Sequence, residues 1–186
     1  MAVIFKAKRV VGKNLYLRDI CEDDAQFVFD LRTDPVKSRH LSATSGRVED
    51  QVNWIRSYKD KDDQAYFIVC DKESNRLGCI RMYDPIGNSY CWGSWLMRDG
   101  LGPLVAIESA LLVYSYGVSL GFTEARIDVR QRNESVWKFH EKFAGAELIK
   151  EDDLDRFYVV KAEKISRMLA KYGEFLTSPL IVERLQ

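Results

Sequence analysis

Apolar and polar positions alternate along several short stretches of the chain, which is typical of strands with a buried face. The stretches predicted as strands are 15–20, 66–70, 77–83, 90–97, 125–130 and 157–160, of which 66–70 is a short continuous apolar run instead of an alternating one. Apolar residues at helical spacing predict helices between and after these strands. The predicted helices are 22–33, 49–59, 104–120, 134–144 and 165–176. The order is therefore strand, two helices, three strands, helix, strand, helix, strand and a helical tail.

The three central strands are joined by short turn-rich links at 71–76 and 84–89, which indicates an antiparallel meander. No Pro- or Gly-rich linker divides the chain, and 186 residues suit one domain. We therefore expect a single α/β (α+β) domain.

A tight loop at 98–103 follows the last strand of this meander and opens the most apolar helix. Gly100 and Gly102 permit close approach to the backbone, and the N–H groups at a helix start can bind an anion. An ordinary turn is the competing interpretation. The loop is not a nucleoside-triphosphate loop, because no Gly-Lys-Ser/Thr follows, and it lacks the three-glycine dinucleotide fingerprint.

Residues 14–162 resemble the GNAT acetyltransferase superfamily in the order of their elements. The segments similar to the family are Leu15-Tyr-Leu-Arg18 with Glu22-Asp-Asp-Ala25, Trp92-Gly-Ser-Trp-Leu-Met97 and Asn133-Glu-Ser-Val-Trp-Lys-Phe-His-Glu-Lys-Phe143. The first of these looks like the ribosomal-protein-acetyltransferase branch. The resemblance implies an acetyl-CoA-dependent N-acetyltransferase on a mixed, mostly antiparallel twisted sheet with helices on both faces. It also implies one acetyltransferase domain over 1–186, with its core at 14–162 and a C-terminal helical tail at 163–186.

The loop departs from the family signature Gln/Arg-x-x-Gly-x-Gly/Ala. Aligned on 101–106, only Ala106 fits, and Pro103 has no N–H to donate. A shifted alignment from Arg98 keeps the arginine but places Leu101 and Pro103 at the small positions.

The resemblance nevertheless implies that acetyl-CoA binds to the strand end, the loop and the two following helices. A backbone N–H near the strand end is expected to polarise the thioester carbonyl. The expected contacts with acetyl-CoA are Trp95, Leu96, Met97, Arg98, Gly100, Leu101, Gly102, Leu104, Val105, Ala106, Asn133 and Trp137.

His140 stands where many family members have a tyrosine that protonates the leaving thiolate of coenzyme A. An imidazolium can supply that proton, because histidine titrates near neutral pH. Val136, Phe139 and Phe143 share the same helix face, so a packed core histidine is the competing interpretation. If His140 is the acid, His140→Phe should lower turnover more than acetyl-CoA affinity.

The base that deprotonates the acceptor amine has no obvious position, since the strand at 90–97 carries no carboxylate. His40 and Asp84 are the candidate catalytic groups besides His140, and Asp128 is a third candidate base. Each has a structural alternative, as a surface, turn or strand-face residue. A water chain replaces the base if none of them serves.

Composition narrows the function further. The 28 basic and 28 acidic residues give zero net charge, which argues against nucleic-acid binding and against attraction to a membrane surface. The N-terminus does not follow the pattern of a secretory signal, and the apolar run at 104–118 is short for a membrane span. The four cysteines lack metal-ligand spacing, so we expect reduced thiols, no metal and a cytoplasmic location.

Two groups of the superfamily suggest which amine the protein acetylates. The segments 107–114 and 127–140 resemble enzymes that acetylate nucleotide-linked deoxyamino sugars for bacterial surface polysaccharides such as lipopolysaccharide. Trp92 and Trp95 suit a sugar or nucleotide platform, or alternatively core packing. We expect this small-molecule amine as the acceptor. The alternative acceptor is a peptide N-terminus. A second alternative is that the protein binds acyl-CoA without catalysing a reaction.

The C-terminal tail has two interpretations. Residues 164–176 cover an edge of the sheet, or Met168, Leu169 and Phe175 form a homodimer contact.

Overall fold

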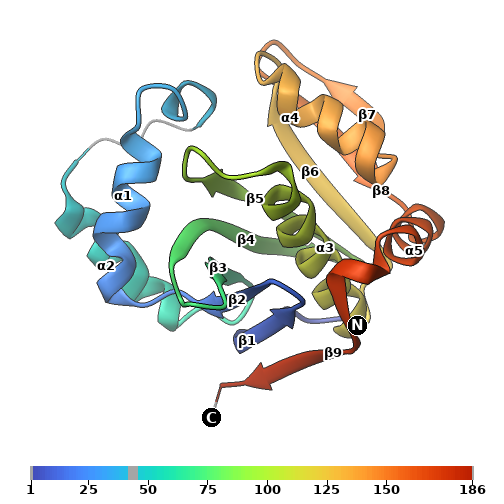
Figure 1. Ribbon diagram of the computed structural model, residues 1–186. Coiled ribbons are helices and arrows are strands. Elements are labelled where there is room, and N and C mark those ends of the chain that lie inside the picture. Colours follow the sequence, from blue (N-terminus) through green and yellow to red (C-terminus); the bar gives the residue numbers. More distant parts are fainter. Residues whose placement is uncertain (1, 42–45, 186) are drawn as a thin grey trace.

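The computed structural model describes residues 2–41 and 46–185. These residues form a nine-stranded sheet in the order β7-β8-β6-β5-β4-β3-β2-β1-β9 (Figure 1). The strands are β1 (Ala7–Gly12), β2 (Leu15–Asp19), β3 (Ala65–Asp71), β4 (Arg76–Ile86), β5 (Ser89–Met97), β6 (Glu124–Arg130), β7 (Glu147–Glu151), β8 (Asp155–Val160) and β9 (Leu176–Arg184). The helices are α1 (Ala25–Thr33), α2 (Val48–Lys59), α3 (Pro103–Ser119), α4 (Glu134–Phe139) and α5 (Ala162–Lys171). Strands β5 and β6 pair in parallel and the other recorded pairs are antiparallel, which confirms the predicted fold class.

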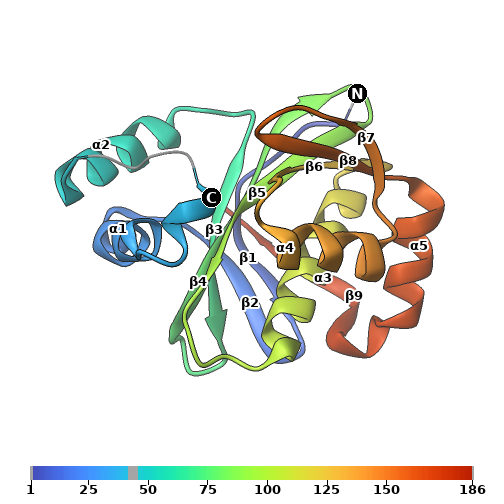
Figure 2. The ribbon, with the colours of Figure 1, turned by 90° about the horizontal axis from the view of Figure 1, so that it is seen from above.

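Helices cover both faces of the sheet. Figure 2 shows α1 and α2 on one face and α3, α4 and α5 on the other. Strand β3 explains why both faces are filled, because Tyr66 and Ile68 pack into the cluster under α1 and α2 while Phe67 and Val69 pack into the cluster under α3. Neighbouring residues of a strand point to opposite faces, so a strand buried on both sides is a continuous apolar run.

Helix α3 is the main support of the sheet, and it is buried from Glu108 to Gly117 apart from Ser115. The Glu108 carboxylate accepts the backbone N–H groups of Asn14 at 2.7 Å and Leu15 at 2.9 Å, and the Asn14 amide at 2.8 Å. A Cβ at Gly117 would stand 2.5 Å from the Tyr90 ring, so this glycine lets α3 approach β5 closely. These contacts fix the start of α3 relative to the strands.

Three strands lie outside the sequence-based expectation. Strands β1, β7 and β9 were not predicted, and the predicted helical tail at 163–186 is wrong beyond α5, since 176–184 is a strand. Strand β9 pairs antiparallel with β1, with Val182 opposite Val10. Pro179 obscures this strand in the sequence, but a proline is tolerated at a sheet edge where one side needs no ladder partner.

The tail also packs onto the body of the protein. Met168 is 3% exposed, and Leu169 and Phe175 contact the main core cluster. Met168 is therefore used within the chain, whereas Leu169 and Phe175 are partly exposed, and a homodimer contact through them stays a prediction. The edge-covering interpretation fits, since β9 covers β1.

Candidate active site

A gap opens in the sheet between its two parallel strands. Strands β5 and β6 pair at Ser89 with Glu124, Tyr90 with Ala125 and Cys91 with Arg126. Beyond Cys91 no further pair between the two strands is recorded in the described chain, although β5 continues to Met97 and β6 to Arg130. Figure 1 shows the two strands diverging from there. Because the ladder stops there, the far ends of β5 and β6 are not joined to each other by recorded strand pairs.

A β-bulge lies on the β5 side of this gap. Arg81 of β4 pairs with Gly93, but Cys79 pairs with Leu96, so Ser94 and Trp95 stand opposite a single residue of β4. Ser94 has a φ of 47°, in the left-handed region. A bulge interrupts the ladder and redirects backbone and side chains, and such bulges are frequent beside active sites. The interruption lies just before Leu96 and Met97, where the sequence placed the carbonyl-polarising N–H.

The loop after β5 is open to a ligand. A Cβ added at Gly100 or Gly102 would meet no atom within 4 Å. The N–H of Arg98 donates to Leu77 and that of Val105 to Gly102, whereas the N–H groups of Gly100 and Leu101 donate to no acceptor in the described chain. Free N–H groups together with the start of the 17-residue helix α3 suit an anion such as a diphosphate. The loop is therefore suited to bind the diphosphate of acetyl-CoA, although its sequence departs from the family signature.

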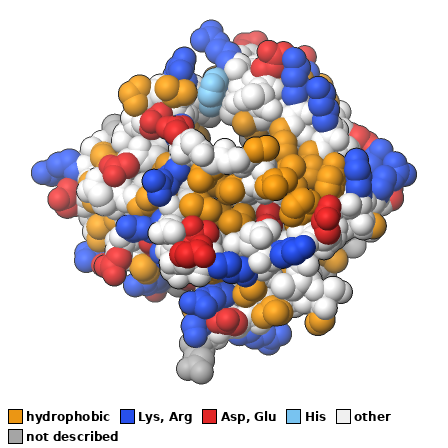
Figure 3. Space-filling model, in the orientation of Figure 1, with side chains coloured by type: hydrophobic (Ala, Val, Ile, Leu, Met, Phe, Trp, Pro, Cys, Tyr) orange, Lys and Arg blue, Asp and Glu red, His pale blue; other side chains and the backbone are white. Residues whose placement is uncertain are grey.

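Apolar surface adjoins this loop. Figure 3 shows hydrophobic side chains gathered over α3 and the neighbouring part of α4. Leu101, Val105 and Phe139 are partly buried and pack against the core, and Leu104 is 56% exposed. An apolar wall beside an anion-binding loop suits a ligand with a long, weakly polar arm and a phosphate group.

The tryptophans of β5 join the strand to the helices. Trp95 donates from Nε1 to Ser109 Oγ at 3.1 Å, and its ring lies 5.2 Å from Phe139. Trp92 is 1% exposed, so the core-packing interpretation holds for Trp92. At the start of α4, Asn133 is partly exposed and Trp137 donates to the Gln131 carbonyl at 3.1 Å. Their contact with acetyl-CoA stays a prediction.

His140 lies inside this aromatic cluster. It is 2% exposed, and its ring is 5.1 Å from Trp92 and 5.8 Å from Trp95. Its Nδ1 has no hydrogen-bond partner among the described residues. Burial lowers the pKa of His140 to about 3, so the ring is neutral at pH 7. An imidazolium acid does not fit this position, and the geometry favours the packed histidine.

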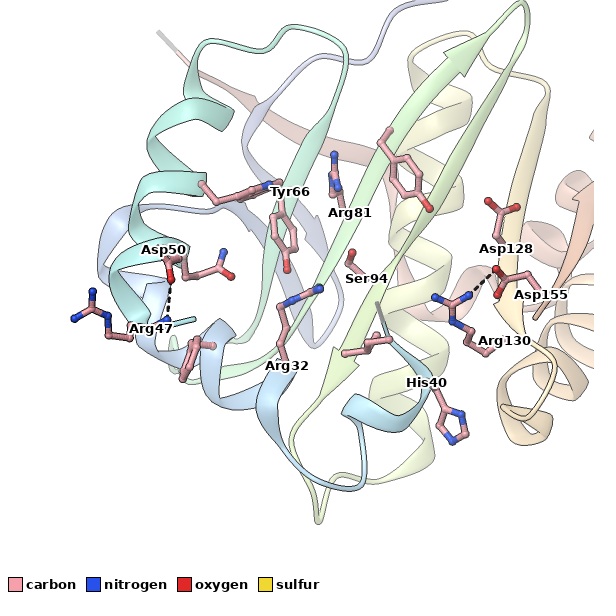
Figure 4. Close-up of a pocket in the computed structure, with 15 residues that line it drawn as sticks. Arg32, His40, Arg47, Asp50, Tyr66, Arg81, Ser94, Asp128, Arg130 and Asp155 are labelled. Atoms are coloured by element: carbon pink, nitrogen blue, oxygen red, sulfur yellow. Dashed lines mark hydrogen bonds and ion pairs between the residues drawn. The ribbon is translucent and has the colours of Figure 1, made fainter. Parts of the chain in front are cut away.

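The opposite face of the sheet carries a cavity of about 580 Å³ at the gap (Figure 4). Its lining comes from α1, α2, the ends of the connection between them, and the strands β3, β4, β5, β6 and β8. The lining residues are Phe29, Arg32, His40, Leu41, Arg47, Asp50, Gln51, Trp54, Tyr66, Arg81, Tyr83, Ser94, Asp128, Arg130 and Asp155. Cations and aromatic rings dominate the lining, which suits a ligand with anionic and ring-shaped parts.

The charges of the cavity are only partly compensated. Arg130 pairs with Asp155 at 2.7 Å, and Asp50 accepts the backbone N–H of Arg47 at 2.8 Å (Figure 4). Arg81 lies between the rings of Trp54 and Tyr83, 5.2 and 4.9 Å from their centroids, and forms no ion pair with a carboxylate of the described chain. Burial lowers the pKa of Arg81, which indicates a cation held in a partly desolvated place.

The other two predicted catalytic residues lie in different places. His40 lines the cavity, but Figure 4 shows its ring at the rim, directed away from Asp128. The side chain of Asp84 is 55% exposed and pairs with Arg126 at 3.0 Å. Asp84 lies near the end of β4, in the irregular stretch between Tyr83 and Ile86, where its φ is 51°. It is therefore a strand residue rather than the predicted turn residue, and it does not line this cavity.

Asp128 is the carboxylate best placed at the gap. It projects from β6 into the cavity beside Arg130, while its neighbours Ile127 and Val129 point into the core. The cavity walls desolvate Asp128 and raise its pKa, Arg126 lowers it, and the charges of Asp155 and Asp84 raise it further. The alternation of residues 126–130 is the sequence signal that indicated this strand face.

Most of the cavity was not foreseen from the sequence. Arg32, Arg47, Trp54, Tyr66 and Arg81 carry no motif, and they meet only because the sheet and α1–α2 bring them together. Across residues 2–41 and 46–185, no group of three or more His, Cys, Asp or Glu side chains is arranged to hold a metal ion. Within the same ranges, every helix is too short or too polar to cross a membrane.

Comparison with known proteins identifies this arrangement. A family model described as an acetyltransferase (GNAT) domain matches residues 14–145. The apo structure of FdhC, described as a nucleotide-linked sugar GNAT, has 34% sequence identity and a TM-score of 0.81, over 91% of this chain and 98% of that chain. No curated protein matches the chain in sequence.

Two further structures share the fold. A probable GNAT acetyltransferase from Chromobacterium violaceum has 16% identity and a TM-score of 0.75, over 89% of this chain and 92% of that one. A GCN5-related N-acetyltransferase from Brucella melitensis has 16% identity and a TM-score of 0.74, over 93% and 87%. The family match and the 34% identity to FdhC show that the chain belongs to the GNAT family and is an acetyl-CoA-dependent N-acetyltransferase.

Proposed function

We propose that this enzyme acetylates the primary amine of a nucleotide-linked deoxyamino sugar for surface-polysaccharide synthesis. The observation that carries the proposal is the cavity of about 580 Å³, which lies at the β5–β6 gap and combines arginines with aromatic rings. A nucleotide sugar needs cations for its diphosphate and flat surfaces for its base and sugar. The description of FdhC as a nucleotide-linked sugar GNAT supports the same acceptor class.

The charge pattern suits an acceptor that carries both signs. Arg81 donates to Gln64 Oε1 but forms no ion pair with a described carboxylate, so its positive charge is left to balance the acceptor's diphosphate. Asp128 is the acidic group that faces the gap without a close ion-pair partner in the described chain, and it suits the amine. In this arrangement the diphosphate lies toward α1–α2 and the amine toward β6.

The two substrates approach from opposite faces. Acetyl-CoA supplies an activated acetyl group as a thioester. The loop at 98–102 and the start of α3 hold its diphosphate through backbone N–H groups, and a backbone N–H near Leu96 or Met97, just after the bulge, donates to the thioester oxygen. Fixing two substrates across one gap supplies much of the acceleration through orientation.

Asp128 acts as the general base. Its raised pKa brings a carboxylate closer to the pH at which an amine must lose a proton before attack. The neutral amine nitrogen then bonds to the thioester carbon and the C–S bond breaks, so that coenzyme A leaves as the thiolate. The nitrogen loses its second proton to solvent as the amide forms, and the thiolate takes up one proton from solvent to become the thiol. One water between Asp128 and the amine is compatible with the access of solvent to Asp128.

A thiol-release assay with acetyl-CoA tests the proposal. The panel contains nucleotide-linked amino sugars, the same sugars without the nucleotide, and peptides with free N-termini. We expect release with nucleotide-linked sugars and little with the free sugars. Activity restricted to peptides contradicts the acceptor and favours the N-terminal alternative. Acetyl-CoA binding without turnover of any amine contradicts the whole proposal and favours the non-catalytic alternative.

A further inference from the structure

The loop at 98–102, which is expected to hold acetyl-CoA, contacts a cation from another part of the chain. Lys37 follows α1, and its Nζ donates to both carboxylate oxygens of Asp99, at 2.8 and 2.9 Å. Asp99 immediately precedes Gly100 in the loop between β5 and α3. The segment after α1 therefore crosses the end of β5 and meets the loop from the acceptor side.

The two partners of this ion pair are held differently. The side chain of Lys37 is 15% exposed, whereas that of Asp99 is 86% exposed. Asp34 fixes the lysine further, since its Oδ1 accepts the backbone N–H groups of Val36 and Lys37 and its Oδ2 lies 3.5 Å from Nζ. The ammonium is thus the fixed member of the pair, and the carboxylate is the exposed one.

A fixed cation beside an exposed carboxylate is open to exchange. An ion pair with an exposed partner contributes little to stability, because water competes for the charges. A diphosphate carries more negative charge than a carboxylate and offers more acceptor oxygens. The loop carries one cation of its own, Arg98, and the Lys37 ammonium adds a second positive charge at Asp99.

We propose that Lys37 is a donor-binding residue, which exchanges Asp99 for the diphosphate of acetyl-CoA when the donor enters the loop. The proposal rests on the placement of the donor in the loop at 98–102, and it does not depend on the identity of the acceptor. Lys37 also begins the turn that carries His40, since its carbonyl accepts the His40 N–H at 3.3 Å. Donor binding is thereby connected to the rim of the acceptor cavity.

Calorimetric titration of the purified chain with truncated donors tests the proposal without an acceptor. The ligands are CoA, 3′-dephospho-CoA, which keeps the diphosphate, and pantetheine, which lacks it; pantetheine is measured by competition if its binding is weak. For Lys37→Met we expect about tenfold weaker binding of CoA and of 3′-dephospho-CoA, because a charge-assisted hydrogen bond is lost. Binding of pantetheine should stay unchanged.

Three matched variants complete the experiment. Lys37→Arg should retain most of the affinity, and Arg39→Met removes an exposed cation two residues away and should leave it unchanged. Asp99→Asn removes the competing anion, so CoA should bind as tightly as before or more tightly. Thermal unfolding of each variant checks that the fold is intact.

Several outcomes overturn the proposal. In Lys37→Met they are an unchanged affinity for CoA, a loss of pantetheine affinity equal to the loss of CoA affinity, and a loss of CoA affinity with no matching loss for 3′-dephospho-CoA. In Asp99→Asn it is a loss of CoA affinity as large as that in Lys37→Met. The last of these shows that the ion pair only shapes the loop. If the unmodified chain binds no CoA, the donor placement itself fails, which distinguishes this failure from that of Lys37.

Discussion

The proposed role of Asp128 as general base can be tested by removing its charge and by moving its pKa in both directions. Asp128→Asn keeps the shape of the side chain and cannot accept the proton. A general base contributes about 10²–10⁴-fold to rate. Because solvent reaches Asp128, water replaces part of its function, and we expect a rate contribution at the lower end of this range. The loss in kcat should be about 10²-fold, or about 2.7 kcal/mol of transition-state stabilisation.

The pH dependence of kcat gives the sharper test, because it reports groups of the bound complex. The base must be deprotonated, so kcat falls as the pH drops through the pKa of Asp128. That pKa is raised chiefly by desolvation, so the fall should occur at a higher pH than for an ordinary aspartate. In Arg126→Met the loss of a nearby positive charge should move the fall to higher pH. In Asp155→Asn the loss of a negative charge should move it to lower pH.

The assay measures acetyl transfer to the best acceptor of the panel at saturating substrates, from pH 4.5 to 9 in about half-unit steps. Opposite shifts in the two neighbour variants, together with the loss in Asp128→Asn, are the expected result. The reasoning is refuted if Asp128→Asn retains its kcat with an unchanged pH profile. It is also refuted if the two neighbour variants shift the profile in the same direction, because their charges have opposite effects on Asp128.

Three further changes follow from single contacts. Arg81→Met should raise KM for nucleotide-linked acceptors about 10- to 100-fold and leave CoA affinity unchanged, because one charged contact to the diphosphate is lost; equal losses for acceptors without phosphate contradict it. His140→Phe should leave turnover nearly unchanged. The folded pKa of His140 is about 3 and its unfolded value about 6.5, so below pH 6.5 the unfolded chain takes up a proton that the folded chain does not. From pH 7.5 to pH 5 the unmodified protein should therefore lose about 2 kcal/mol more stability than His140→Phe, measured by urea unfolding at both pH values. Glu108→Ala should lower the free energy of unfolding by about 2–4 kcal/mol, since the N–H groups of Asn14 and Leu15 lose their acceptor, and Glu108→Gln should lose less.

The sequence determined the central part of the protein. Alternation, one continuous apolar run at β3 and helical spacing located β2 to β6, β8 and the helices α1 to α4, because these elements bury one face or, in β3, both faces. The same order of elements led to the GNAT family, which the family match confirms. The pattern of apolar residues along each segment was sufficient for these elements, since each pattern reports burial along that segment alone.

The outer strands could not be predicted from such signals. Strand β7 is mostly exposed, and β9 contains Pro179 and exposed positions. Their positions are stabilised by pairing with β8 and β1, which lie elsewhere in the sequence. A strand at a sheet edge buries little of its own surface, so its pattern of apolar residues is weak.

The site needed the tertiary structure most of all. The sequence singled out His140 for its place in a motif, yet burial among tryptophans keeps the ring neutral. It gave no sign that Arg32, Trp54 and Arg81 face Asp128 across one cavity, or that Lys37 reaches Asp99. Hydrophobic patterning depends on neighbours along the chain, whereas pKa values and charge pairing depend on groups that only the folded sheet brings together.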